Sequence, residues 1–353
     1  FECTIFHNPM QLTERLNPMS DSLFALTAFN EFFQNLGSWL TLPMELFSFL
    51  WREEFIMLLL PAIYWCWDAA FGFRLGALLM FGNAVNSIFK LAFHAPRPYW
   101  INPEIQAYSA ESSFGMPSGH AQNSTLLWGR LAAAIRRKWV TAVFVFIILM
   151  IGVSRIYLGV HFISDVVVGW LIGVVLLWAA LRLEKPIASW LGPKSVPVQI
   201  VWALLFALLV ILLGAAARLA LAGWQMPAEW AANASLQVPD EPIAPFALEG
   251  IVTASGTWWG MAAGYAWYTR RFGRFDAGGD WSKRALRFSL GLIVVLILWF
   301  GLGQIFPRNE DVLSFVLRFA RYALLGAWVS AGAPWVFVRL KLANGPALAK
   351  TGK

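Results

Sequence analysis

Apolar runs long enough to cross a bilayer recur along the whole chain, and this feature constrains its fold more than any other. A transmembrane helix needs roughly 20 consecutive, mainly apolar residues. Hydrophobic residues make up 59% of the chain and charged residues 13%, which is roughly half the charged fraction of a soluble domain. We therefore predict an all-α fold, a polytopic membrane helical bundle with about nine transmembrane helices.

The chain divides into three parts according to where these runs lie. In residues 1–54 polar residues interrupt the apolar ones, as in helices that lie at a membrane interface. Residues 55–185 are predicted to form a core, and residues 186–353 to add further transmembrane helices. Segment 223–244, which contains several prolines, is predicted to be a loop. The expected spans are 55–72, 74–91, 119–135, 139–157, 162–182, 198–222, 245–268, 287–306 and 313–338.

The basic residues indicate which side of the membrane each loop faces. The formal net charge is +7, but the Lys and Arg residues are spread among the gaps between spans, so we expect no nucleic-acid partner. Alternate loops and the C-terminal tail hold 17 of the 27 Lys and Arg residues, and the opposite loops hold six. Because cytoplasmic loops carry the excess of positive charge, we expect an integral membrane protein with a cytoplasmic C-terminus, located in a bacterial plasma membrane.

Three polar motifs fall on the other, extracytoplasmic side. The first ends the second predicted span, the next opens the third, and the last links the fourth span to the fifth. The predicted spans therefore bring the motifs together around one cavity at the membrane surface. The motifs are KLAFHAPRP (90–98), PSGH (117–120) and SRIYLGVHFISD (154–165).

The charges in these motifs predict a phosphate site. Lys90, Arg97 and Arg155 would bring three cations together, with Asp165 as the internal counter-charge. Such a cluster beside lipid is costly without a bound anion of high charge. Guanidinium groups match the geometry of phosphate oxygens, and lysine adds a point charge. The pair Ser118–Gly119, at a helix N-terminus, adds free backbone N–H groups that also favour phosphate.

Two histidines complete a site for phosphoryl transfer. His161 precedes Asp165 by four residues, so on a helix both side chains lie on one face. A carboxylate bonded to one ring nitrogen leaves the other as a nucleophile, and His120 can act as the general acid. We expect a phospho-His161 intermediate that water hydrolyses, and a bell-shaped pH profile. The three cations can stabilise the transferred group, so we expect no metal and no cofactor.

These motifs resemble the three-part signature of the type 2 phosphatidic acid phosphatase superfamily. That family includes lipid phosphate phosphatases, undecaprenyl-pyrophosphate phosphatases, glucose-6-phosphatase and vanadium haloperoxidases. The resemblance covers about residues 74–182, and every signature position is filled. It implies that His161 is the nucleophile, Asp165 its partner, and His120 the acid. It also implies a set of phosphate-binding residues: Lys90, Arg97, Ser118, Gly119 and Arg155.

Several functions stay open at this stage. We favour a lipid phosphomonoester or terminal pyrophosphate as substrate, because the cavity should open at the level of the lipid head groups. The alternative is a soluble sugar phosphate, because the number of spans resembles that of glucose-6-phosphatase. A transporter or phospholipid-binding protein without hydrolysis, or a lipid phosphotransferase, is a further alternative. Small residues in 253–264 permit close helix packing or a homodimer contact.

Other residues near the motifs receive simpler interpretations. Glu111 is expected to be a solvated loop carboxylate. Tyr99, Trp100 and Tyr157 fit either contact with the substrate or the aromatic belt at a membrane interface. Taken alone, His120 is more simply a helix-capping residue, and only its combination with the cations makes it catalytic.

Overall fold

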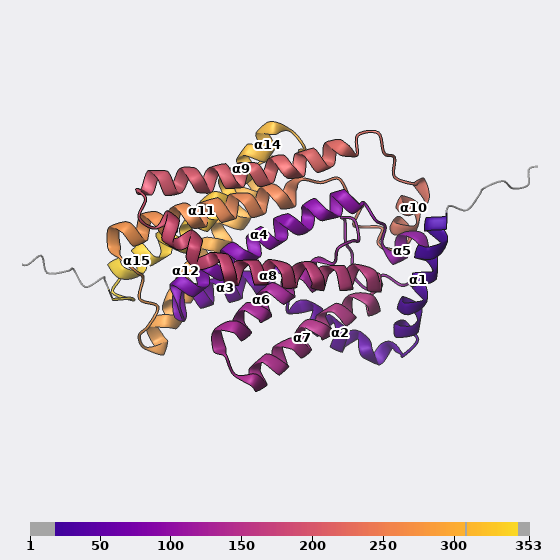
Figure 1. The fold of residues 1–353 in the computed structure, drawn as a ribbon, viewed down its shortest axis with the longest axis horizontal. Coiled ribbons are helices and arrows are strands. Elements are labelled where there is room, and N and C mark those ends of the chain that lie inside the picture. Colours follow the sequence, from indigo (N-terminus) through magenta and orange to yellow (C-terminus); the bar gives the residue numbers. More distant parts are fainter. Residues whose placement is uncertain (1–17, 308, 345–353) are drawn as a thin grey trace, which may run out of the picture.

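The computed structural model of the protein describes residues 18–307 and 309–344, and those residues form helices and loops without a strand. Long helices run side by side in a bundle, and α1 lies across one end of it (Figure 1). The all-α prediction is confirmed. The helices are α1 (Pro18–Gln34), α2 (Thr41–Phe49), α3 (Glu53–Cys66), α4 (Ala69–Phe93), α5 (Pro98–Ile101), α6 (Gly119–Ile135), α7 (Lys138–Tyr157), α8 (Ile163–Leu191), α9 (Val196–Ala220), α10 (Ala228–Gln237), α11 (Glu249–Phe272), α12 (Trp281–Leu296), α13 (Leu302–Ile305), α14 (Val312–Ala327) and α15 (Ala333–Arg339). A 3-10 turn, η1 (Ser38–Leu40), and two π-helical turns, η2 (Ile297–Gly301) and η3 (Trp328–Gly332), join some of them.

Among the described residues, six helical stretches are long and apolar enough to cross a membrane. They are Ala69–Ile101, Lys138–Tyr157, Ile163–Leu191, Val196–Ala220, Trp281–Ile305 and Val312–Arg339. Three of the predicted spans coincide instead with α3, which has 14 residues, α6, which has 17, and α11. Helix α11 has 24 residues but a less apolar composition. The count of about nine spans is therefore not confirmed.

The predicted spans 55–72 and 74–91 place a break at residue 73, and that prediction is wrong. The break falls before α4, where the carboxylate of Asp68 accepts a hydrogen bond from the N–H of Phe71 (2.8 Å) and caps the helix. Gly72 lies inside α4, where a Cβ would come within 2.7 Å of the backbone of Tyr64. The apolar pattern alone did not show this boundary, because the capping signal is a single aspartate.

Segment 223–244, predicted to be a loop, contains α10, so that prediction is wrong in part. Pro227 immediately precedes α10, and proline is tolerated at the start of a helix. Asn233 on α10 donates a hydrogen bond to the main-chain O of Trp100 on α5 (3.0 Å). The segment therefore folds back over α5 instead of forming an open connection.

The described part of residues 1–54 packs against the end of the bundle, and residues 1–17 lie outside the described residues. Asn30 of α1 is buried and donates hydrogen bonds to the main-chain O of Ile156 (2.8 Å) and of His161 (3.0 Å). Ser48 of α2 is buried as well. These helices thus hold the connection between α7 and α8 in place.

Helix α11 packs against α4, α9 and α14, and its small residues permit a close approach to α14. A Cβ on Gly260 would lie 1.9 Å from the carbonyl O of Ala323, and a Cβ on Gly256 would lie 2.6 Å from that of Phe319. The stretch 253–264 is therefore used for helix packing within the chain. This contact joins the C-terminal helices to the rest of the bundle through α11.

Gly260→Val should destabilise the protein, because the added side chain would force α11 and α14 apart at a contact that leaves no room for a Cβ. Overpacking of this kind costs about 1–3 kcal/mol or more. We expect a lower apparent Tm in detergent, measured by thermal unfolding. Gly301→Val is the control, because a Cβ at Gly301 meets nothing within 4 Å. Equal Tm values for the two variants would contradict the assigned packing.

Candidate active site

The candidate active site lies where α4 and α7 end and α6 and α8 begin. Main-chain hydrogen bonds join the connecting loops at this place. The N–H of Gly115 donates to the O of Ala95 (2.9 Å), and the N–H of Ser118 donates to the O of Asp165 (2.9 Å). A Cβ on Gly115 would lie 2.4 Å from the O of Pro96. The three sequence motifs are thus held together by backbone contacts that only close approach permits.

His161 and Asp165 form a buried pair at the start of α8, and each side chain is 1% exposed. The Nδ1 atom of His161 lies 3.2 Å from Oδ2 of Asp165, which also accepts a hydrogen bond from the N–H of Phe162 (3.0 Å). A proton on Nδ1 would be donated to the carboxylate, which leaves the lone pair on Nε2. The structure brings together the two residues whose spacing of four predicted a pair.

Arg97 is fully buried beside His161, and the loops around it accept its hydrogen bonds. Its guanidinium donates to the main-chain O of Ser113 (2.7 Å), of Val160 (2.8 Å) and of Phe114 (3.1 Å). Its Nη1 atom lies 3.4 Å from Nε2 of His161. Because carbonyl groups hold the guanidinium in place, Arg97 provides a fixed positive charge next to Nε2 of His161, which accepts from Nη1 when Nδ1 carries the proton.

Arg155 is buried at the end of α7 and reaches two residues that the sequence motifs do not include. Its Nη1 atom donates to Oγ of Ser48 on α2 (2.6 Å). Its Nη2 atom donates to the carboxylate of Glu111. The contact with Ser48 was missed because α2 is more than 100 residues away in the chain, and no local pattern marks it.

The prediction that Glu111 is a solvated loop carboxylate is wrong. The side chain is 23% exposed and forms ion pairs with Arg155 and, at 3.5 Å, with Nη2 of Arg97. Burial alone would raise the pKa of this carboxyl, but Arg97 and Arg155 outweigh it and hold the pKa of Glu111 well below its usual range. Glu111 is therefore a carboxylate that bridges two of the predicted phosphate-binding cations.

The remaining predicted phosphate ligands lie around the start of α6. Nζ of Lys90 donates to Oγ of Ser113 (2.7 Å). Gly119 and His120 line a cavity beside it, and Nε2 of His120 is buried without a hydrogen-bond partner in the part of the chain that the structure describes. Ser118 differs from the prediction, because its N–H is taken by a main-chain O and its Oγ caps α6. It supports the helix N-terminus instead of offering a free N–H group.

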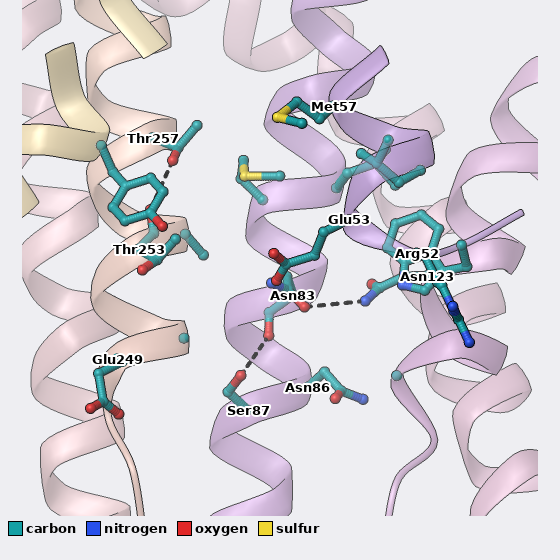
Figure 2. Close-up of a pocket in the computed structure, with 18 of the residues that line it drawn as sticks. Arg52, Glu53, Met57, Asn83, Asn86, Ser87, Asn123, Glu249, Thr253 and Thr257 are labelled. Carbon is teal, nitrogen blue, oxygen red and sulfur yellow. Dashed lines mark hydrogen bonds between the residues drawn. The ribbon is translucent and has the colours of Figure 1, made fainter. Parts of the chain in front are cut away.

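The cavity has a volume of about 1060 Å³. Lys90, Glu111, His120 and Arg155 line one end of it, and it continues between α3, α4 and α11, as Figure 2 shows. His161 is buried behind this surface, and among the residues that the structure describes it is not one of those that line the cavity. The end with the cations is therefore large enough and charged enough to receive a phosphate group.

The aromatic residues of the motifs have a different role from the two that we considered. Tyr99, Trp100 and Tyr157 are fully buried in the apolar core around the site. The hydroxyl of Tyr99 donates to the main-chain O of Glu111 (3.1 Å). These side chains therefore support the loops of the site and contact neither a membrane interface nor the cavity.

The protonation of His161 follows from its surroundings. Burial lowers the pKa of its imidazole well below the usual value, and the nearby charges of Arg97, Lys90 and Arg155 lower it further. The ring is therefore neutral at neutral pH, and its Nε2 lone pair faces a fixed cation. Among the described residues, no cluster of three His, Cys, Asp or Glu side chains has the arrangement of a metal site.

Comparison with known proteins points to one family. Family models match residues 71–188 as the PAP2 superfamily and residues 252–345 as the transmembrane extension of PAP2 superfamily phosphatases. Together the two matches cover more than half of the chain. The chain belongs to the PAP2 superfamily. This is the type 2 phosphatidic acid phosphatase superfamily that the motifs resemble, so that prediction is confirmed.

Individual PAP2 relatives differ in how much of the chain they match. Phosphatidylglycerophosphatase B of Bacillus subtilis is 30% identical over 31% of this chain. The matched part covers 57% of the length of that relative. Glucose-6-phosphatase 3 of Rattus norvegicus is 24% identical over 89% of this chain and 92% of its own. A solved structure, the first transmembrane PAP2 type phosphatidylglycerolphosphate phosphatase from Bacillus subtilis, covers 49% of this chain and 89% of that chain, with 23% identity and a TM-score of 0.41.

Membership of the PAP2 superfamily confirms two further predictions. The chain is an enzyme of the phosphatase class, because the matching relatives are phosphoric monoester hydrolases. It is also an integral membrane protein, because the second match is to a transmembrane extension and the helices are apolar.

Glu111→Gln should strengthen the binding of inorganic phosphate several-fold. The Glu111 carboxylate occupies an Arg155 donor that a phosphate would use, and it adds a like charge beside the bound anion. Titration calorimetry of the detergent-solubilised protein with inorganic phosphate measures this change. Glu104→Gln is the control, because Glu104 is an exposed carboxylate in the same loop. Weaker phosphate binding by Glu111→Gln would show that the carboxylate positions the arginines and does not compete with phosphate.

Proposed function

We propose that this PAP2 protein hydrolyses a phosphomonoester through a covalent phospho-His161 intermediate. The observation that carries the proposal is the placement of the His161 imidazole between Asp165 and Arg97. Nδ1 faces the carboxylate at 3.2 Å, and Nε2 faces the guanidinium at 3.4 Å. A neutral imidazole with an oriented lone pair is suited to attack a phosphate that the charge of the neighbouring cation attracts.

The reaction takes two steps. First, Nε2 of His161 attacks phosphorus, a P–N bond forms, and the P–O bond to the leaving alcohol breaks as His120 gives that oxygen a proton. Then water attacks phosphorus, His120 takes the proton of the water, the P–N bond breaks, and inorganic phosphate leaves. Throughout, Asp165 holds the proton on Nδ1 and stabilises the positive charge that develops on the ring. The position of His120 on the cavity wall supports this assignment.

The cations and the start of α6 bind the phosphate in this proposal. Lys90 and Arg155 line the cavity, and Arg97 adds its charge from within the wall. Gly119 is the first residue of α6, and the N–H groups at a helix N-terminus favour anions, while Ser118 caps that turn. Because these groups neutralise the transferred phosphoryl group, the proposed reaction uses no metal and no cofactor.

The extent of the similarity favours a soluble sugar phosphate as substrate over a lipid phosphate. Glucose-6-phosphatase 3 of Rattus norvegicus and glucose-6-phosphatase 2 of Homo sapiens match 89% and 72% of this chain, whereas phosphatidylglycerophosphatase B matches 31%. This reverses the preference for lipid that we drew from the motifs. A lipid phosphate is the second candidate, and comparing phosphate release from glucose 6-phosphate, phosphatidylglycerol phosphate and phosphatidate separates the two.

We place the site on the extracytoplasmic face of a bacterial plasma membrane. The bias of Lys and Arg toward the opposite loops and the C-terminal tail supports this orientation. Nine spans, with a core at 55–185 and additional helices at 186–353, remain our proposal for the topology. A homodimer also remains a prediction, now without the contact at 253–264, because that stretch packs within the chain.

His161→Ala should lower the turnover of p-nitrophenyl phosphate by about three orders of magnitude or more, as expected when a nucleophile is lost. Phosphate binding should persist, because the cations remain. His120→Ala should accumulate the phosphoenzyme with this substrate, because its leaving group needs no acid while the second step needs a base. Acid-labile ³²P labelling measures the intermediate. Full turnover by His161→Ala would refute the mechanism, and binding without turnover in the unaltered protein would indicate a transporter or binding protein.

The acid limb of kcat/KM should lie below pH 6.5. The nucleophile must be neutral, and the pKa of His161 in the free protein is lowered from 6.5 by burial and by the neighbouring cations, so activity is lost only as pH falls through that lower value. Because a phosphate ester titrates near pH 6, the profile is measured with two esters of different phosphate pKa. An acid limb that lies at the same pH with both esters belongs to the protein. If that shared limb lies above pH 6.5, this account is contradicted.

A further inference from the structure

The cavity extends from the cation end along two helices, and its first section has a polar wall that the proposed reaction does not use. On α4, Asn83 and Ser87 line it, followed by Lys90 at the site. On α11, Thr253 and Thr257 line it on the other side. Figure 2 shows these side chains on the two helices, with Glu249 on the same helix as the threonines. We call Asn83, Ser87, Thr253 and Thr257 the polar wall.

We infer that the polar wall binds the hydroxyl groups of the leaving alcohol, so that the substrate is a polyhydroxylated phosphomonoester. This inference rests on the proposed function and names the substrate class of the same site. It also gives the C-terminal transmembrane extension, which begins at residue 252, a role in substrate selection through α11.

The spacing of the residues places the wall next to the phosphate end. Asn83, Ser87 and Lys90 are separated by four and three residues, so they lie on one face of α4. Seven residues of helix advance about 10 Å, which is the scale of a hexose phosphate. Thr253 and Thr257 are also four residues apart and share one face of α11.

Contacts between the two helices fix their register. A Cβ on Gly250 would lie 3.4 Å from Oγ of Ser87, and a Cβ on Gly76 would lie 2.6 Å from Cε of Met261. The helices are therefore antiparallel, and the start of α11 lies beside the end of α4. By this register Thr253 lies level with Asn83, and Thr257 lies about one turn further from the phosphate end.

The wall offers hydrogen-bonding capacity that its own contacts leave open. The hydroxyl of Thr257 donates to the main-chain O of Thr253 (2.9 Å), and that of Ser87 donates to the main-chain O of Asn83 (3.1 Å). Both oxygens therefore keep lone pairs that can accept. Oγ of Thr253 accepts from Arg318 (3.3 Å), so its own proton can be donated.

This pattern favours hydroxyl groups over a hydrocarbon chain. An acyl chain beside the wall could not use the remaining lone pairs of Ser87 and Thr257 or the hydroxyl proton of Thr253. Hydroxyl groups would satisfy them. Further from the phosphate end, α4 contributes Met80 and α11 contributes Met261 to the lining. A free sugar phosphate and a lipid with a hydroxylated head group therefore share the required chemistry.

Thr257→Val and Ser87→Ala test the inference, because each removes one hydroxyl from the wall. Both variants should lower kcat/KM for glucose 6-phosphate about tenfold, the effect of one lost hydrogen bond, and leave p-nitrophenyl phosphate unchanged. Thr269→Val is the matched control, since Thr269 also lies on α11 and donates to a main-chain O one turn earlier but is absent from the described cavity lining. The control should leave both substrates unchanged.

The same variants distinguish a free sugar phosphate from a lipid with a hydroxylated head group. A tenfold effect with glucose 6-phosphate alone assigns a free sugar phosphate, and the same effect with phosphatidylglycerol phosphate alone assigns a hydroxylated lipid head group. Equal losses with p-nitrophenyl phosphate would overturn the inference, because the wall would then support the fold. Faster hydrolysis of phosphatidate than of either hydroxylated ester, unaffected by Thr257→Val, would overturn it as well.

A binding measurement separates this inference from the proposed function. Calorimetry compares glucose 6-phosphate, phosphatidylglycerol phosphate in micelles and inorganic phosphate on the unaltered protein and on Thr257→Val. If no ester is hydrolysed, but the variant binds one hydroxylated ester about tenfold more weakly and inorganic phosphate equally well, the proposed function fails and the subsite stands. If hydrolysis occurs and the variant binds every ligand like the unaltered protein, the subsite fails and the proposed function stands.

Discussion

The buried positive charge of Arg97 is the constraint on which the rest of the site depends. A guanidinium buried away from solvent needs acceptors for its N–H groups. Burying its charge without such partners costs several kcal/mol of folding free energy. Here the main-chain oxygens of Ser113, Phe114 and Val160 accept these hydrogen bonds. Two loops that are far apart in the chain must therefore fold around one guanidinium. That requirement brings His161 to the position where its Nε2 atom faces the cation.

Glu111 balances part of the positive charge around Arg97. Its carboxylate bridges Arg97 and Arg155, so these two cations share a counter-charge. A phosphate that enters meets prearranged donors, which is the arrangement expected for electrostatic stabilisation of a transferred group. The remaining cavity, between α4 and α11, then decides which alcohol can accompany that phosphate.

Part of the site could be predicted because its signals are local. The spacing of four between His161 and Asp165 places both on one helical face, and the structure shows the pair in contact. Glu111 and Ser48 could not be recognised in the same way. Their roles arise from contacts across 44 and 107 residues, and a carboxylate in a polar loop has no sequence pattern that distinguishes pairing from solvation.

The sequence by itself determined the helical class, the membrane setting and the family, because apolar length and motif spacing are properties of short segments. It also indicated which charged residues belong together. Only the tertiary structure decided that α1 and α2 bond to the α7–α8 connection and to Arg155, that Arg97 is held by carbonyl groups, and that α11 supplies a cavity wall. These features depend on which helices pack against each other, and helix packing is set by close contacts such as Gly260 against Ala323 that the apolar pattern does not specify.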